Sequence, residues 1–393
     1  MANEIGAHHH HLLLLLLLLV FATPPSALAW QTSGTGRTST GLRLTSSSDQ
    51  TEVPATYPLA RRALLDRAEQ IGATSGSYSA VGWSNRLGSV LTPASVPGVY
   101  EAGRPFMWNG IDVGCRMVVI ELQGGEEGRP DLFVHSPVAL DDRLAGALDS
   151  IGSVRHVVSP NYEHVKFAYQ WAERYPDACI WACPGLAERE PLVRWTGEIP
   201  ALARPAGYPP VEGEGDPPSR PEGMWDWDEI QPLHVDTEVN PFTGRPFFNE
   251  VVFYHSPSKT LLTTDTYWNY PSPDGITNTV YAEMPGGSST PTVNAKTGQE
   301  ERDFGAWDLA PEVGKIPLGS SLWKLGMDKL FRPFYLNLMT KPSSKDRFRH
   351  LAAFASGVNE SGWDVQTVIP AHGDVIRGKT FCRGVLKQHF DLR

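Results

Sequence analysis

The stretch VVSPNYEHVKFAYQW, residues 157–171, contains three local patterns in succession. Its apolar start is typical of a short buried strand, the Ser-Pro-Asn-Tyr segment predicts a turn, and the residues after it predict the start of a helix. The turn carries Asn161, Glu163 and His164, whose side chains are all able to bind a metal ion. A strand that ends in such residues indicates an α/β domain with a site at the edge of its sheet.

Strand and helix patterns alternate on both sides of this stretch, which favours layers of sheet and helix. Two apolar runs around a Gly-rich turn predict a hairpin, and the segments after it alternate between helical and strand patterns. We expect strands over 116–122, 131–137, 155–159 and 179–183, and helices over 140–152 and 163–176.

The second half resumes the β pattern after a Pro- and Gly-rich loop over 203–224. Residues 249–269 predict another hairpin, with Asp265 at the exit of its second strand. Residues 365–378 predict a strand that leads directly into His372, and helices are expected over 322–339 and 345–358. Three apolar strands therefore end in ligand-type residues, at 159–164, at 265 and at 372.

Several of these segments together resemble a known superfamily. VIPAHGDVI is similar to the closing Pro-x-His-Gly motif of the metallo-β-lactamase superfamily, and LLTTDTYWN resembles its metal-bridging aspartate strand. A closer resemblance is to a metallo-β-lactamase-like family of unknown function from plants, algae and cyanobacteria. It implies an αββα sandwich, in which two mixed β-sheets pack between helices, over residues 104–393.

The resemblance also implies a reduced metal site. HVVSPNYEHVKF lies where the superfamily carries its histidine-rich motif, so that Ser159 and Asn161 replace two histidines while Glu163 and His164 keep ligand character. No histidine stands just ahead of the Asp265 hairpin, so one of the two metal positions is expected to be lost. The implied metal ligands are His164, Asp265, His372, Glu163 and His135, and the implied catalytic residues are Glu163 and Asp265.

Two histidines with two carboxylates suit one divalent ion, either Zn, Fe or Mn. Such an ion with an open coordination position would lower the pKa of water and support hydrolysis. The alternative is that no metal binds, because a histidine at a helix start is often only a hydrogen-bonded residue and Glu163 would favour a helix dipole anyway.

The first 103 residues form three predicted parts. Residues 12–21 are apolar and too short to span a membrane, and Ala27 and Ala29 fit a cleavage site, so residues 1–29 are expected to be a signal peptide. Residues 30–50 are Ser/Thr-rich and transit-like, which favours plastid targeting, with secretion as the alternative. Residues 51–103 are an expected extension with one amphipathic helix over 59–71, and no membrane span is expected in the mature protein.

Composition limits the classes of partner. The 393 residues are 41% hydrophobic and carry a net charge of −10, which supports a sizeable core and argues against a nucleic-acid-binding surface. Four scattered cysteines do not suggest a disulfide scaffold, and Cys179 and Cys183 are expected to be buried thiols rather than a metal or redox pair.

Two functions follow from these observations. The first is a plastid mononuclear metal-dependent hydrolase of an ester, thioester or similar small molecule. The alternative is a non-catalytic scaffold or ligand-binding protein, favoured by Ser159 and Asn161 and by tryptophans such as Trp225 and Trp227 that could line a ligand pocket. An oxidoreductase with a di-iron centre would need more ligands than the sequence offers.

Overall fold

The structure is a computed structural model that describes residues 91–94, 96–104, 106–108, 111–125, 128–140, 142–209, 215–270, 292–293, 300–301, 323–340, 342–373 and 375–392. The expected presequence and the expected helix over 59–71 lie outside these residues. Within the described part, no helix combines the length and hydropathy needed to cross a membrane.

The first sheet is mixed and has seven strands. Antiparallel pairs join its first four strands, and parallel pairs join β6, β7, β8 and β9. It includes the expected hairpin and the strands expected over 155–159 and 179–183. Its first two strands come mainly from residues that were predicted to belong to the N-terminal extension. In spatial order the strands are β1 (Thr92–Pro93), β2 (Val99–Arg104), β5 (Cys115–Glu121), β6 (Asp131–His135), β7 (Ser153–Ser159), β8 (Cys179–Ala182) and β9 (Gly197–Glu198).

The second sheet is also mixed and has five strands. Its central pair, β12 and β15, is parallel, so the carboxyl ends of these two strands lie at the same edge. In spatial order the strands are β10 (Ile230–Val235), β11 (Glu250–His255), β12 (Thr260–Thr263), β15 (Thr367–Pro370) and β16 (Ile376–Arg377). Two short separate pairs are β3 (Met107–Trp108) with β4 (Ile111–Asp112), and β13 (Thr292–Val293) with β14 (Glu300–Glu301).

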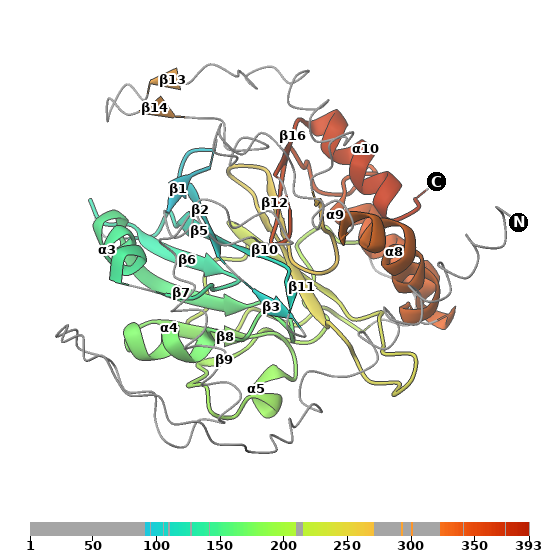
Figure 1. Cartoon of the computed structure of the whole chain (residues 1–393), viewed down its shortest axis with the longest axis horizontal. Helices are drawn as coiled ribbons and strands as arrows, with labels where there is room; N and C mark the ends of the chain where they lie inside the picture. Colours follow the sequence, from blue (N-terminus) through green and yellow to red (C-terminus); the bar gives the residue numbers. More distant parts are fainter. Residues whose placement is uncertain are drawn as a thin grey trace, which may run out of the picture. The chain divides into compact units, whose positions relative to one another are not determined.

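The two sheets face each other and helices cover their outer faces (Figure 1). The rings of Phe133 on β6 and Phe253 on β11 lie 5.8 Å apart, in the layer between the sheets. The next residue on β11, Val252, instead lies with Phe348 and Leu351 of α9. The helices are α3 (Asp142–Ile151), α4 (Ala168–Arg174), α5 (Leu186–Arg189), α8 (Arg332–Phe334) between the π-helical turns η2 (Met327–Phe331) and η3 (Tyr335–Met339), the 3-10 turn η4 (Pro342–Ser344), α9 (Lys345–Ala355) and α10 (Lys379–His389). This arrangement confirms the predicted α/β architecture of two mixed sheets packed between helices.

Several elements differ from those expected, three of them in or beside the second sheet and the metal-site turn. Helix α4 begins at Ala168, not near residue 163, because the side chain of Asn161 holds the preceding residues in a turn. Strand β10 was not predicted, because its Pro232 resembles a loop residue; the strand lies at the sheet edge, where proline is tolerated. Helix α10 was also not predicted.

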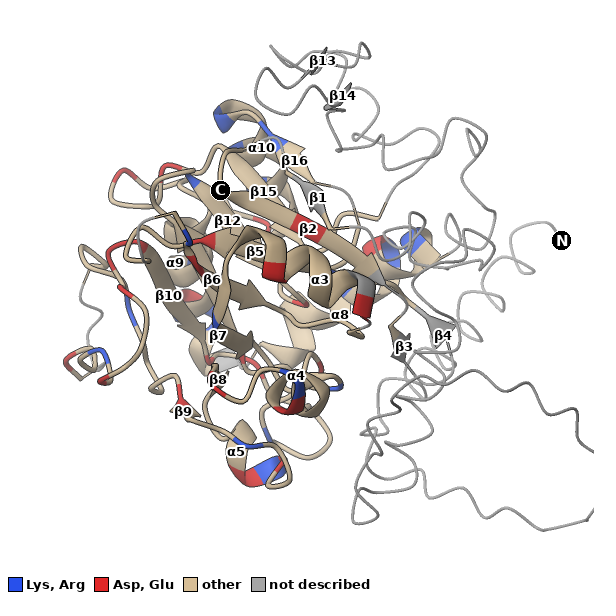
Figure 2. Cartoon of the chain, turned by 90° about the vertical axis from the view of Figure 1, so that its left-hand side faces the viewer, with Lys and Arg blue, Asp and Glu red and all other residues tan. Residues whose placement is uncertain are grey.

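Charged residues lie mainly on the helices and the connecting loops, and some lie on strands such as β2 (Figure 2). Its Glu101 is 2% exposed and forms an ion pair with Arg116 on the neighbouring strand β5, which is 1% exposed. The Arg116 guanidinium also donates to the carbonyl oxygens of Pro370, at 3.1 Å, and Gly373. This buried pair therefore ties the first sheet to the loop that follows β15.

Candidate metal centre

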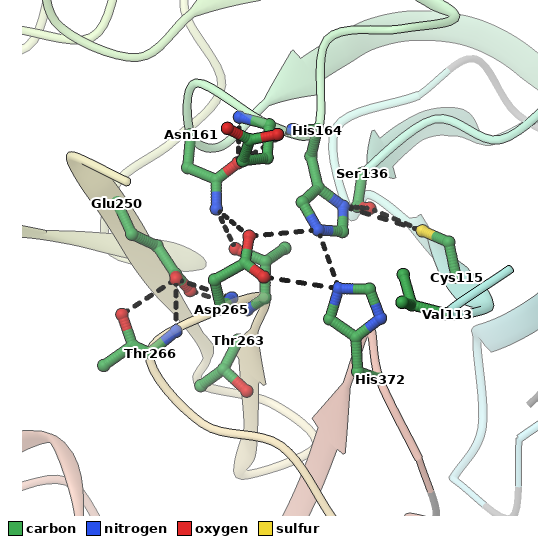
Figure 3. Close-up of polar contacts among 12 residues, drawn as sticks. Val113, Cys115, Ser136, Asn161, His164, Glu250, Thr263, Asp265, Thr266 and His372 are labelled. Atoms are coloured by element: carbon green, nitrogen blue, oxygen red, sulfur yellow. Dashed lines mark hydrogen bonds and ion pairs between the residues drawn. The ribbon is translucent and has the colours of Figure 1, made fainter. Parts of the chain in front are cut away.

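Three side chains from the ends of three strands converge on one point (Figure 3). His164 comes after β7, Asp265 after β12 and His372 after β15. The two histidine Nε2 atoms are 3.1 Å apart, and the Asp265 Oδ2 and Oδ1 atoms lie 3.3 Å from Nε2 of His164 and 3.4 Å from Nε2 of His372. The parallel pairing of β12 with β15 brings Asp265 and His372 together, and the facing first sheet supplies His164.

The backbone fixes the tautomer of His372. Its Nδ1 atom lies 2.6 Å from the carbonyl oxygen of Gly114. A carbonyl oxygen only accepts hydrogen bonds, so Nδ1 carries the proton and Nε2 of the neutral ring is an unprotonated lone pair. That lone pair faces Nε2 of His164.

His164 is oriented by residues of the first sheet. Its Nδ1 atom lies 2.7 Å from Oγ of Ser136 and 3.6 Å from Sγ of Cys115. Ser136 follows β6 with a φ of 56°, a left-handed conformation that non-glycine residues rarely adopt. When Ser136 accepts from Nδ1, the Nε2 atom of His164 is also a lone pair, and both imidazoles present metal-binding nitrogens to the same point.

A buried carboxylate holds the loop of Asp265. Glu250 on β11 is 1% exposed and accepts hydrogen bonds from the backbone N–H groups of Thr264, Asp265 and Thr266, at 2.6, 2.8 and 2.6 Å, and from the Thr266 hydroxyl at 2.8 Å. The side-chain amide of Asn161 donates directly to Oδ2 of Asp265 at 2.6 Å. Asp265 is thus fixed both from its backbone and from one carboxylate oxygen.

The charges of the centre follow from burial and proximity. Burial alone would raise the pKa of Asp265, but His164 and His372 lower it more, so its pKa lies well below the usual range and the carboxylate is ionised. Burial lowers the pKa of His164, against the opposing effect of Asp265. Burial and the nearby Asp265 raise the pKa of Glu250 to about 7, although the N–H groups bonded to it act in the opposite direction.

The donor set fits one divalent ion. Two imidazole nitrogens bound at about 2.0–2.1 Å lie about 2.9 Å apart at a right angle and about 3.3 Å apart at the tetrahedral angle. The observed 3.1 Å falls between these separations. The side chains of His164 and His372 are 1% and 6% exposed, whereas that of Asp265 is 16% exposed, so solvent reaches the centre mainly beside the carboxylate.

Two of the predicted ligands do not join this group. His135 lies on β6 with its ring 5.4 Å from that of Phe253, and among the described residues neither of its ring nitrogens has a hydrogen-bond partner. Burial lowers the pKa of His135 to about 3, so the ring is neutral. Glu163 donates its backbone N–H to Asn161, and burial raises its carboxyl pKa to about 7. Among the described residues, the side chains of His164, Asp265 and His372 lie together, and those of His135 and Glu163 are not part of this group.

The sequence alone does not identify the residues that orient the three side chains. Ser136 and the carbonyl oxygen of Gly114 could not be recognised from the sequence, because serines are common and every residue has a backbone carbonyl oxygen. Rings also hold the imidazoles: that of Phe106 stacks on His164 at 4.8 Å and that of Tyr270 on His372 at 6.1 Å. Glu250 did carry a signal, because it is an acidic residue within the otherwise apolar run EVVFY.

Comparison with known protein families identifies the family of this chain. Residues 107–305, which are 199 of the 393 residues, match the domain of unknown function DUF4336. The chain belongs to the DUF4336 family. The DUF4336 match contains His164 and Asp265 and ends before His372. No curated protein matches the chain.

Solved structures similar to this DUF4336 protein include several metallo-β-lactamases. The DIM-1 enzyme is 12% identical with a TM-score of 0.40, over 77% of this chain and 95% of its own. The enzyme from Pontibacter korlensis is 9% identical with a TM-score of 0.39, over 77% and 99% of the two chains. The enzyme from Hirschia baltica is 10% identical with a TM-score of 0.39, over 77% and 98%.

Proposed function

We propose that this protein binds one divalent metal ion through His164, Asp265 and His372 and is a hydrolase of an ester, thioester or similar small molecule. One observation carries the proposal. The Gly114 carbonyl holds a proton of His372 on Nδ1, and its Nε2 atom faces a second imidazole nitrogen at 3.1 Å and an ionised carboxylate. A cation at this point would interact favourably with all three groups.

Three protein ligands suit a catalytic ion, because they leave coordination positions for water and substrate. Two imidazoles with one carboxylate are compatible with Zn, Fe or Mn. When bound, such an ion would polarise a substrate carbonyl and make water more acidic. The chain itself supplies orientation: Ser136 and Gly114 set the two rings, and Glu250 and Asn161 set the carboxylate. A proton-transfer role for Glu163, beside His164, stays a prediction.

Metal content of the purified protein tests the centre. We expect one ion per chain after loading with Zn²⁺, Mn²⁺ or Fe²⁺, and its loss in His164→Ala and His372→Ala. His156→Gln is the matched control, because His156 is a buried histidine on β7 whose ring contacts Trp181 and not the centre. Metal content far below one ion per chain, unchanged in His372→Ala, would reject the proposal.

A second candidate is a non-catalytic binding or scaffold protein. It is favoured by the small exposure of the two histidines and by a metal-free network that is chemically complete. In that network Ser136 donates to Nδ1 of His164, whose Nε2–H then donates to His372 or Asp265. A screen of esters and thioesters with each loaded metal separates the two: hydrolysis that is lost in His164→Ala excludes the scaffold.

The cellular location is a separate proposal. The signal-like residues 1–29 and the transit-like residues 30–50 support plastid import, with secretion as the alternative. A fluorescent protein fused behind residues 1–50 would accumulate in plastids in the first case and outside the cell in the second. The net charge of −10 supports a small-molecule substrate over a nucleic acid.

A further inference from the structure

Asn161 uses all of its hydrogen-bonding capacity within the centre. Its Nδ2 group donates to Oδ2 of Asp265 at 2.6 Å and to Oγ1 of Thr264 at 2.9 Å. Its Oδ1 atom accepts from the backbone N–H groups of Glu163 at 3.0 Å and His164 at 2.8 Å. The residue is fully buried, so these four contacts replace solvent completely.

These contacts fix which way the amide points. If the oxygen and nitrogen of Asn161 were exchanged, the NH₂ group would meet the N–H groups of Glu163 and His164, and the oxygen would meet the carboxylate of Asp265. Both contacts would be repulsive, so only one orientation is possible. One positively polarised hydrogen of the amide therefore points at Oδ2 of Asp265, and the other points at the hydroxyl of Thr264.

We propose that Asn161 restricts the centre to a single metal ion by placing an amide hydrogen at Oδ2 of Asp265, where a second ion would have to bind. This inference rests on the proposed metal centre. An ionised carboxylate has about four lone-pair sites on its two oxygens, and it bridges two cations when two of these sites face separate ions. The Asn161 N–H occupies one of the sites on Oδ2. In this chain Oδ1 faces His372, whereas Oδ2, which lies beside His164, is also bound by the amide. Asn161 thus sets both the number of ions and the way in which Asp265 binds.

The substitution Asn161→Asp isolates this effect. The aspartate has nearly the same shape, and one of its oxygens keeps the two backbone N–H contacts, so the turn before α4 is retained. Its other oxygen replaces the NH₂ group and faces Oδ2 of Asp265. Two carboxylate oxygens that close together repel strongly unless a cation lies between them, and oxygen ligands favour hard ions such as Mn²⁺.

The test counts Mn²⁺ ions bound to the full-length protein by native mass spectrometry, with electron paramagnetic resonance to detect coupled pairs. The wild-type protein should saturate at one ion with the spectrum of isolated Mn²⁺. Asn161→Asp should bind a second ion and show a coupled pair. Thr264→Val is the matched control, since it removes the other acceptor of the same amide but leaves the contact with Asp265, and it should stay at one ion.

The outcomes separate this inference from the function on which it rests. A wild-type protein that binds no metal rejects the metal centre. A wild-type protein that binds two ions, an Asn161→Asp variant that stays at one, or a Thr264→Val variant that reaches two rejects the role of Asn161 alone.

A second measurement covers the case in which Asn161→Asp does not fold. In ¹⁵N-asparagine-labelled wild-type protein, the Asn161 NH₂ signal, assigned through its shift in Thr264→Val, should resist exchange with solvent both without and with excess Zn²⁺. Release of that NH₂ group by added Zn²⁺ would overturn the inference.

Discussion

The imidazoles and the carboxylate of the centre are held in different ways. Each imidazole is oriented mainly through its Nδ1 atom, by Gly114 for His372 and by Ser136 for His164. The loop of Asp265, by contrast, is bound by Glu250 through three backbone N–H groups and one hydroxyl, and its carboxylate is bound by Asn161. We infer that the residues that hold Asp265 contribute to the stability of the fold. By contrast, substitution of the residue that orients His164 should change the free energy of unfolding little.

The largest expected effect concerns Glu250. Glu250→Ala removes the acceptor of four hydrogen bonds and leaves buried N–H groups without partners, so we expect a loss of about 3–5 kcal/mol in the free energy of unfolding. Urea unfolding of the metal-free protein measures it. Thr266→Val removes only the hydroxyl donor and should cost about 1 kcal/mol. A Glu250→Ala variant that unfolds like the wild type would show that the residues holding Asp265 do not stabilise the fold more than those orienting the histidines.

The next effect is the response of the first sheet to acid. His156 is buried, and its Nδ1 accepts a hydrogen bond from Nε1–H of Trp181 at 3.1 Å. Burial lowers the pKa of His156 to about 4, below the 6.5 expected for the unfolded chain. The stability that this neutral ring contributes is therefore complete above pH 6.5 and is lost as the pH falls toward 4, by about 3 kcal/mol.

Comparing unfolding at pH 7 and pH 4.5 in the wild type and in His156→Gln tests this expectation. The variant should be less stable at pH 7 but should lose less stability on acidification. Equal losses in the two proteins would show that the acid response comes from other groups.

The smallest expected effect concerns Ser136. Ser136→Ala removes the partner that orients His164 but leaves the three ligands, so we expect a 10–100-fold loss of metal affinity with a change in unfolding free energy of less than about 1 kcal/mol. Cys115→Ala is the matched control, because the Cys115 thiol lies at 3.6 Å from the same nitrogen and should contribute little. Competition with a chelator measures the affinity. A large loss of stability without loss of metal affinity would show that Ser136 stabilises the fold and does not orient His164 for metal binding.

The sequence was sufficient to predict the architecture and the convergence of His164, Asp265 and His372, for a common reason. The strands before His164, Asp265 and His372 are continuous apolar runs. The change from apolar residues to residues able to bind a metal can therefore be read directly from the sequence. The pairings of β5 with β6 and of β11 with β12 followed from short turns between such runs. Whether a metal binds them stays a prediction.

The sequence could not show how the ligands are oriented. Gly114 acts through its carbonyl oxygen, which every residue has, and the role of Ser136 depends on a positive φ that no local pattern signals. Asn161 appeared only as a replaced histidine, because its four contacts reach residues on both sides of the centre. His135 appeared as a ligand because it ends a strand, but the pleat directs its ring toward Phe253.

The buried ion pair of Arg116 and Glu101 has a consequence for the order of events in the cell. Arg116 bonds to carbonyl oxygens 254 and 257 residues further along the chain, and the two histidines are 208 residues apart in sequence. A ribosome must therefore have translated and released the chain beyond Gly373 before these groups can meet. Any ion that these side chains hold would be bound only after that point, and a chain cut short before Pro370 would contain His164 and Asp265 without His372.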